Sequence, residues 1–310
     1  MEKRMTGRIV NPMAALLTHD YSHLLLTPNW EVQVRQWLHD DIPGFDYGGF
    51  VVGDVVRTAR LLGKSPGVIA GVPFAALVFA EMDCEVEWLM NEGDVITPEM
   101  AAKRVLVAKV TGKVRNVLLA ERTALNIMAR ASGIATLTKT IVDSVRAVGW
   151  AGQVAATRKT TPGFGLVEKY AVLVGGGSTH RMNLSAMVML KDNHIWSTGS
   201  ITESVVKAKR VVGFSTKIEV ECSTLADARE ASLAGADVCM LDNFVGDSLQ
   251  VAASALKAEF PHVVVEASGG ITAATIATYV CDSVDVVSMG CLTQGYSFVD
   301  FSLKVTPPSQ

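Results

Sequence analysis

Residues 217–242 read KIEVECSTLADAREASLAGADVCMLD, and this stretch decides the fold class. It begins with a short β-branched run at 217–220, passes through a polar turn into a helical pattern, and returns to an apolar run at 238–241. A strand, a helix and a second strand in this order are typical of a βα unit with parallel strands. The stretch therefore predicts an α/β protein.

The same pattern recurs on both sides of this unit. Comparable runs begin at residues 153, 187, 263 and 286, so the six runs are spaced by 34, 30, 21, 25 and 23 residues. These spacings suit successive βα units of one parallel sheet, either a barrel or a doubly wound sheet. We favour a βα barrel because polar or glycine-rich groups follow the runs, and the carboxyl ends of barrel strands meet at one rim, where active sites are built.

The earlier part of the chain has a different pattern. Residues 51–62 and 105–110 have strand-like patterns and residues 74–82 a helical one, which together indicate an α+β unit. From residue 116 to 147 the apolar positions recur at helical spacing through one or two long helices, with Gly133 as the expected break. We therefore expect a domain boundary at this point.

The composition excludes several classes of protein. Of the 310 residues, 49% are hydrophobic and 19% are charged, which argues against disorder and predicts a substantial buried core. The longest uncharged run, residues 65–80, contains two prolines and is too short to span a bilayer. A net charge of −3 gives no general attraction to nucleic acid.

The cysteines and the N-terminus bear on location. Five cysteines without C-x-x-C spacing indicate neither a disulfide framework nor a zinc site, and they fit a reducing, cytoplasmic environment. Glu2, Asn11 and Pro12 are unfavourable for a targeting peptide, so we expect no targeting signal.

Positive charge gathers between residues 158 and 191. Arg158, Lys159 and Lys191 each follow an apolar run, so we expect them to point into the barrel mouth, whereas Lys169 is expected to face solvent. Arginine suits planar carboxylates and lysine suits phosphates, so either kind of anion is a plausible ligand. His180 is either structural or functional; its position beside Arg181, after three glycines, favours function.

Two acids and two glycine-containing turns complete the candidate site. Glu221 and Asp242 end successive strands, where they serve either as helix caps and salt-bridge partners or as a platform for sugar hydroxyls, a developing cation or hydrated Mg²⁺. After the next two runs come backbone N–H groups that suit a phosphate, the first set preceding a helix-like pattern at 272–279. These groups belong to Ser268, Gly269, Gly270 and Gly290.

Arg122 stands apart from this group. On a helix it shares one face with Leu118, Leu125, Ala129 and Ser132, so it is expected within an apolar stripe. A buried charge needs a partner, either in an internal ion pair or in a ligand reached across a subunit interface.

Together these residues resemble the quinolinate phosphoribosyltransferase family. The likeness runs in order from about residue 45 to 305. Its segments are ERTALN at 121–126, TRKTTPG at 157–163, EKY at 168–170, HR at 180–181, KDNH at 191–194, KIEVEC at 217–222, LDNF at 241–244, VEASGGI at 265–271 and DFSL at 300–303.

The resemblance implies both a fold and a reaction. The fold would be a partly open, TIM-like βα barrel of about six to seven strands, residues 133–291, with an N-terminal α/β sandwich domain, residues 1–132, completed by residues 292–310. The reaction, in de novo NAD biosynthesis, would join quinolinate to phosphoribosyl pyrophosphate and give nicotinate mononucleotide, pyrophosphate and CO₂, with Mg²⁺ required. Two subunits of a homodimer or hexamer would share each site.

The resemblance also implies roles for single residues. Arg122 would enter the neighbouring subunit's site, and Arg158, His180 and Arg181 would bind the quinolinate carboxylates. The catalytic set would comprise Lys159, Lys191, Glu221 and Asp242, in which the lysines serve the substrate anions and the acids address the ribose hydroxyls and the metal. Thr160 would join the substrate-binding residues, and Ser268, Gly269, Gly270 and Gly290 would hold the 5′-phosphate.

Two residues depart from the family pattern, and two other functions stay open. Gly165 stands where a basic residue is frequent, and Gln294 stands where many bacterial members have histidine, which bears on a pyrophosphate contact. A related phosphoribosyltransferase for another acid is disfavoured because a monoacid would leave part of the positive charge unmatched. A non-catalytic metabolite-binding protein on the same fold would be expected to have lost an acid or a lysine.

Overall fold

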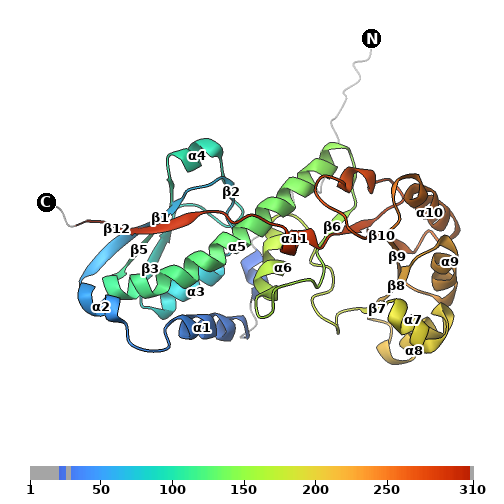
Figure 1. Cartoon of the computed structure of the whole chain (residues 1–310), viewed down its shortest axis with the longest axis horizontal. Helices are drawn as coiled ribbons and strands as arrows, with labels where there is room; N and C mark the ends of the chain where they lie inside the picture. Colours follow the sequence, from blue (N-terminus) through green and yellow to red (C-terminus); the bar gives the residue numbers. More distant parts are fainter. Residues whose placement is uncertain (1–20, 26–28, 308–310) are drawn as a thin grey trace, which may run out of the picture.

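One long helix joins two sheets in the computed structural model, which describes residues 21–25 and 29–307 (Figure 1). The helix, α5 (Val114–Ala147), runs from the N-terminal sheet to the parallel sheet. The residues on which the expectation of no targeting signal rests lie outside the described part of the chain. Within that part, no helix combines the length and apolarity needed to cross a bilayer.

The N-terminal sheet has four antiparallel strands in the order β12-β1-β5-β3. The returning strand β12 (Phe301–Val305) pairs with β1 (Val56–Gly63), which confirms that the C-terminal segment completes this sheet. The remaining elements here are β5 (Val105–Lys113), β3 (Glu85–Trp88), the pair β2 (Gly67–Val68) and β4 (Val95–Ile96), and the helices η2 (Tyr21–Leu25), α1 (Asn29–Asp41), α2 (Tyr47–Val52), α3 (Val72–Glu81) and α4 (Pro98–Ala102).

The strand expected over residues 51–62 begins later than predicted. Val51 and Val52 end helix α2, and the strand starts at Val56. The Asp46 carboxylate caps this helix by accepting from the Gly49 N–H at 2.8 Å, and Gly53 ends it with a φ of 66°. Local capping therefore overrides the strand preference of two β-branched residues.

Gly133 is not a break, because α5 continues through it. A Cβ at Gly133 would lie 2.2 Å from the carbonyl oxygen of Ser297, in the segment that returns to the N-terminal sheet. Glycine is thus required by the close approach of another backbone, and packing offsets its weak helix propensity.

The barrel sheet has six parallel strands in the order β6-β11-β10-β9-β8-β7. The order ends at β6 and β7, so the barrel is partly open, as predicted. Helices α8, α9 and α10 cover its outer face (Figure 1). The strands are β6 (Gln153–Ala155), β7 (Val188–Leu190), β8 (Ile218–Cys222), β9 (Val238–Asp242), β10 (Val264–Ser268) and β11 (Val286–Ser288), and the helices are α6 (Gly165–Val174), α7 (Asp192–Thr198), α8 (Ile201–Val212), α9 (Leu225–Ala234), α10 (Gly246–Glu259), η3 (Ile276–Thr278) and α11 (Cys291–Gln294).

The alternation of side chains along these strands decides what faces the barrel interior. Cys239 contacts α9 through Ser232, so its register partner Val220 lies on the same, helix-covered side. Glu219 and Glu221, one residue to either side of Val220, therefore point into the barrel.

Candidate active site

A cavity of about 810 Å³ opens at the carboxyl ends of the barrel strands. It brings together cations, carboxylates and glycine turns that lie more than 100 residues apart in the sequence. The predicted site residues that line it are Arg158, Lys159, His180, Arg181, Lys191, Glu221, Asp242, Ser268, Gly269, Gly270 and Gly290. Gln294 also lines the cavity, whereas Arg122 and Thr160 do not.

The carboxylates at the rim are coupled to the lysines. Lys191 Nζ forms an ion pair with Glu221 Oε2, so one of the salt bridges considered from the sequence is present. Asp242 Oδ2 accepts from the Asn243 side-chain amide at 2.6 Å. Partial burial, and then the nearby Glu221 carboxylate, raise the pKa of Asp242. A cation placed between these acids would relieve their repulsion.

Residues 178–181 form a turn beside these strands that presents Arg181. The Arg181 guanidinium donates from Nη1 to the Met187 carbonyl at 3.2 Å. Burial, and then the positive charge of Arg158, lower the pKa of Arg181. Two cations this close favour a ligand that carries negative charge on more than one group.

Lys169 was expected to face solvent, and that prediction was wrong. The residue is 2% exposed, and Nζ donates to the carbonyl oxygens of Thr179 and Arg181. Burial, followed by repulsion from Arg158 and Arg181, lowers its pKa to about 8. Lys169 therefore stabilises the turn through its carbonyl groups instead of lying on the surface.

Two acids at or beside this cavity were not among the predicted site residues. Glu266 lines the cavity, and Glu219 lies beside it with 0% exposure. Burial, and then the neighbouring Glu266, raise the pKa of Glu219. Alternation would have revealed both, because each precedes a predicted site residue, Glu221 or Ser268, by two positions on the same strand face.

His180, Glu219 and Glu266 have the residue types of a metal site, and their ligand atoms lie within 4.8 Å of one another. The hydrogen bonds argue against that use. The backbone N–H of Arg181 donates to His180 Nδ1 at 2.8 Å, so the lone pair of the ring lies on Nδ1 and the proton on Nε2. Nε2 then faces Glu266 Oε2 at 3.0 Å as a donor, and the ring has no lone pair for a metal there.

The two glycine turns shape the far end of the cavity. Gly269 and Gly270 have φ angles of 109° and 61°, and a Cβ at Gly269 would lie 2.4 Å from Asn243 Oδ1. Only glycine fits this turn without strain. The Lys159 side chain packs here, with Cδ 3.2 Å from the position that a Cβ of Gly290 would take.

The helix expected over residues 272–279 is only a short 3-10 turn, η3. Thr275 Oγ1 accepts from the Thr272 N–H at 3.0 Å, and this local bond competes with helix formation. Residues of the turn, rather than the end of a long helix, thus line this end of the cavity.

Arg122 was predicted to lie buried within an apolar stripe, but in this single chain it is exposed on α5. Leu118 on the preceding turn of the helix is exposed as well. Helix α2 packs against α5, and Phe50 in α2 is 90% exposed. No salt bridge to Arg122 is found within residues 21–25 and 29–307.

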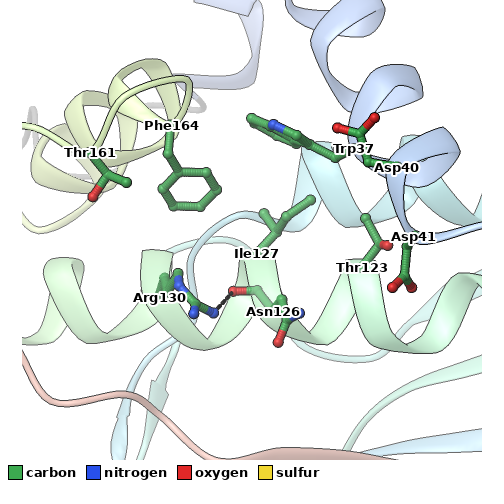
Figure 2. Close-up of a pocket in the computed structure, with 9 residues that line it drawn as sticks. All are labelled: Trp37, Asp40, Asp41, Thr123, Asn126, Ile127, Arg130, Thr161 and Phe164. Carbon is green, nitrogen blue, oxygen red and sulfur yellow. Dashed lines mark hydrogen bonds between the residues drawn. The ribbon is translucent and has the colours of Figure 1, made fainter.

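A second cavity, of about 410 Å³, lies between α1, α5 and the loop before α6 (Figure 2). Figure 2 shows Trp37 and Phe164 above Ile127, with Arg130 donating to the Asn126 carbonyl. Its lining contains no predicted site residue; it consists of Trp37, Asp40, Asp41, Thr123, Asn126, Ile127, Arg130, Thr161 and Phe164.

Comparisons with known proteins cover nearly the whole chain. Residues 47–132 match the family model described as "Quinolinate phosphoribosyl transferase, N-terminal domain", and residues 134–304 match the corresponding C-terminal domain model. The nicotinate-nucleotide pyrophosphorylase [carboxylating] of Dictyostelium discoideum is 48% identical over 90% of this chain and 97% of that protein. The human protein of the same name is 46% identical over 91% of this chain and 94% of its own length. The crystal structure of NadC from Streptococcus pyogenes superposes with a TM-score of 0.82, at 35% identity over 91% of this chain and 99% of that chain.

Proposed function

This chain belongs to the quinolinate phosphoribosyltransferase family, and we propose which residues of its cavity bind each of the two substrates. The activity is carboxylating nicotinate-nucleotide pyrophosphorylase activity, a pentosyl transfer in NAD biosynthesis. Quinolinate and phosphoribosyl pyrophosphate give nicotinate mononucleotide, pyrophosphate and CO₂. The observation that carries the proposal is the single cavity in which Arg158, Arg181, Lys191, Glu221 and Asp242 meet.

The quinolinate dianion is bound by the two arginines together with Lys191, which serves the carboxylate that departs. Arg158 and Arg181 both line the cavity, and burial, followed by the positive charge of Arg158, lowers the pKa of Arg181; a doubly negative ligand would offset the repulsion between the two cations. Guanidinium groups also match the planar carboxylate geometry. His180 lies beside them, but hydrogen bonds already occupy both of its ring nitrogens.

The phosphoribosyl pyrophosphate lies across the glycine turns. Backbone N–H groups around Ser268, Gly269, Gly270 and Gly290 suit its 5′-phosphate. Lys159 packs beside Gly290, and Gln294 lies in contact range of the same position, so both residues favour the phosphate groups of this substrate over quinolinate. Thr160, the next residue, does not line the cavity, so it acts on binding indirectly, by positioning the loop that carries Lys159.

Mg²⁺ fits the pair of rim acids. Glu221 and Asp242 supply carboxylate oxygens, the ligand type that Mg²⁺ prefers, together with water and diphosphate oxygens. Burial, and then repulsion from Glu221, raise the pKa of Asp242, and a divalent cation would relieve the repulsion between the two carboxylates. When bound, the ion supplies charge neutralisation for the departing pyrophosphate.

The chain's own groups then act by position and charge. As pyrophosphate leaves, positive charge develops at the ribose C1, and Glu221 and Asp242 stabilise it electrostatically. The arginines hold the pyridine nitrogen on the opposite face for attack. The resulting ring cation withdraws electrons from the bond to the adjacent carboxylate, CO₂ departs, and the ring carbon takes up a proton.

We also propose a homo-oligomer in which Arg122 completes the neighbouring subunit's site. The exposed Arg122 and Leu118, and the exposed Phe50 on the adjoining helix, support an interface here. Large apolar side chains exposed together mark association surfaces. The five free cysteines support a reducing, cytoplasmic location.

The test is release of labelled CO₂ from carboxyl-labelled quinolinate. We expect release only when both phosphoribosyl pyrophosphate and Mg²⁺ are present, and no nucleotide formation with nicotinate in place of quinolinate. Turnover of nicotinate would favour a related transferase for a monoacid. Binding of both substrates without CO₂ release would favour a non-catalytic protein.

A further inference from the structure

We propose that Glu266 is a positioning residue for quinolinate binding: it fixes the His180 ring, and that ring fixes the backbone from which the Arg181 guanidinium reaches the substrate. The proposal rests on the proposed function, since it assigns the carboxylates to Arg181 rather than to the imidazole. It concerns a residue that does not itself contact the reacting atoms.

The His180 ring is bound at both nitrogens by the protein. Nδ1 accepts from the Arg181 backbone N–H at 2.8 Å, and Nε2 lies 3.0 Å from Glu266 Oε2. A backbone N–H can only donate, so the ring proton resides on Nε2 and is directed at Glu266. The ring therefore has no remaining donor or acceptor for a carboxylate of the substrate.

Among the described residues, the Glu266 carboxylate makes one hydrogen bond, to the His180 ring. The residue is 2% exposed, and its Oε1 has no hydrogen-bond partner within the described residues. Glu219 Oε2 lies 3.7 Å from His180 Nε2, which is too long for a hydrogen bond. The buried acid that fixes the ring is thus Glu266, on strand β10.

The turn itself needs such support. His180 has a φ of 54°, a left-handed conformation that is uncommon outside glycine. Lys169 donates to the carbonyls of Thr179 and Arg181, and the Glu266 carboxylate accepts from the His180 ring. Without the contact to Glu266, His180 can leave this conformation and carry the Arg181 backbone with it.

The experiment compares Glu266→Leu with Glu266→Gln in the full chain. Leucine removes the acceptor, whereas glutamine keeps an oxygen acceptor of the same reach and removes only the charge. We expect Glu266→Leu to raise KM for quinolinate roughly tenfold or more while KM for phosphoribosyl pyrophosphate changes less than about twofold. Glu266→Gln should restore quinolinate KM to within about threefold of the parent value.

Several results would overturn the proposal. An unchanged quinolinate KM in Glu266→Leu would overturn it, and so would an equal rise in KM for both substrates. A Glu266→Gln variant as impaired as Glu266→Leu would also overturn it, because it would indicate a role for charge. An inactive parent protein would instead contradict the proposed function.

A measurement independent of turnover keeps the proposal testable where Glu266→Leu fails to fold. Long-range ¹H–¹⁵N NMR correlations of the parent protein should show the Nε2–H tautomer for His180, assigned by their loss in His180→Gln. The pattern should persist when quinolinate is added. An Nδ1–H tautomer, or a change of protonation on binding quinolinate, would contradict the arrangement.

Discussion

Replacing the buried lysine behind the active-site turn, Lys169→Met, should change how stability depends on pH. Burial lowers the Lys169 pKa to about 8, against 10.5 for an unburied lysine. Between these values the unfolded chain binds more protons than the folded chain, so this group makes stability rise with pH. The sign reflects a charged amine that is unfavourable when buried and becomes neutral as pH increases.

The magnitude follows from the two pKa values. From about pH 7.5 to about pH 9.5, linkage with these values gives a gain of about 2 kcal/mol in the free energy of unfolding. Lys169→Met lacks the titrating group, so the stability difference between the parent and this variant should shift by about that amount in favour of the parent. Other titrating groups cancel because they are common to both proteins.

Urea unfolding at the two pH values, followed by circular dichroism, measures this difference. Lys139→Met, which removes an exposed lysine paired with Asp143, is the matched control for loss of a lysine charge. The reasoning is refuted if the parent and Lys169→Met differ equally at both pH values, or if the parent loses stability relative to the variant as pH rises. A loss would mean that the buried ammonium is stabilised by its two carbonyl partners more than it is penalised by burial.

Three further predictions concern the interface, the metal and the long helix. Arg122→Ala should abolish turnover with the fold intact, and random mixing with inactive Asp242→Ala should restore roughly a quarter of wild-type activity, since half of the dimers are hybrids with one complete site; no rescue in the mixture would contradict shared sites. Asp242→Asn should raise the Mg²⁺ concentration needed for half-maximal CO₂ release about tenfold, measured by metal titration, whereas an unchanged requirement would remove Asp242 from the metal site. Gly133→Ala should destabilise the protein by about 2 kcal/mol or more in urea unfolding because its Cβ meets the Ser297 carbonyl, while Gly44→Ala, with open space around it, should be within about 0.5 kcal/mol of the parent; equal effects would refute the packing argument.

The βα barrel could be predicted from the sequence because each strand carries its own signal. Apolar runs, their spacing and the polar residues after them are local features, and they placed Arg158, Lys191, Glu221 and Asp242 at one rim. Strand alternation is local as well, so Glu219 and Glu266 were within reach of the same reasoning.

Other features depend on contacts that no local pattern contains. Gly133 was predicted to break the helix because the contact that requires glycine there is with Ser297, a residue 164 positions later. Lys169 read as a surface residue because its two carbonyl partners belong to a turn that only the folded chain brings to it. Arg122 read as buried because periodicity finds an apolar face without saying what covers it.

The contacts of Lys191 and Arg181 also bear on how a cationic pocket can release one of the groups it binds. Lys191 is already paired with Glu221, so it shares its charge between that acid and any substrate anion. The Arg181 backbone donates to the His180 ring, so we expect Arg181 to be held in place more firmly than Lys191. A fixed Arg181 suits the carboxylate that stays on the ring, and Lys191, with its competing partner, suits the one that departs. Decarboxylation requires the binding of that carboxylate to weaken as its negative charge moves into the ring. Removing Glu221 should therefore strengthen the binding of quinolinate while slowing CO₂ release, which is the combination that a simple loss of a metal ligand would not produce.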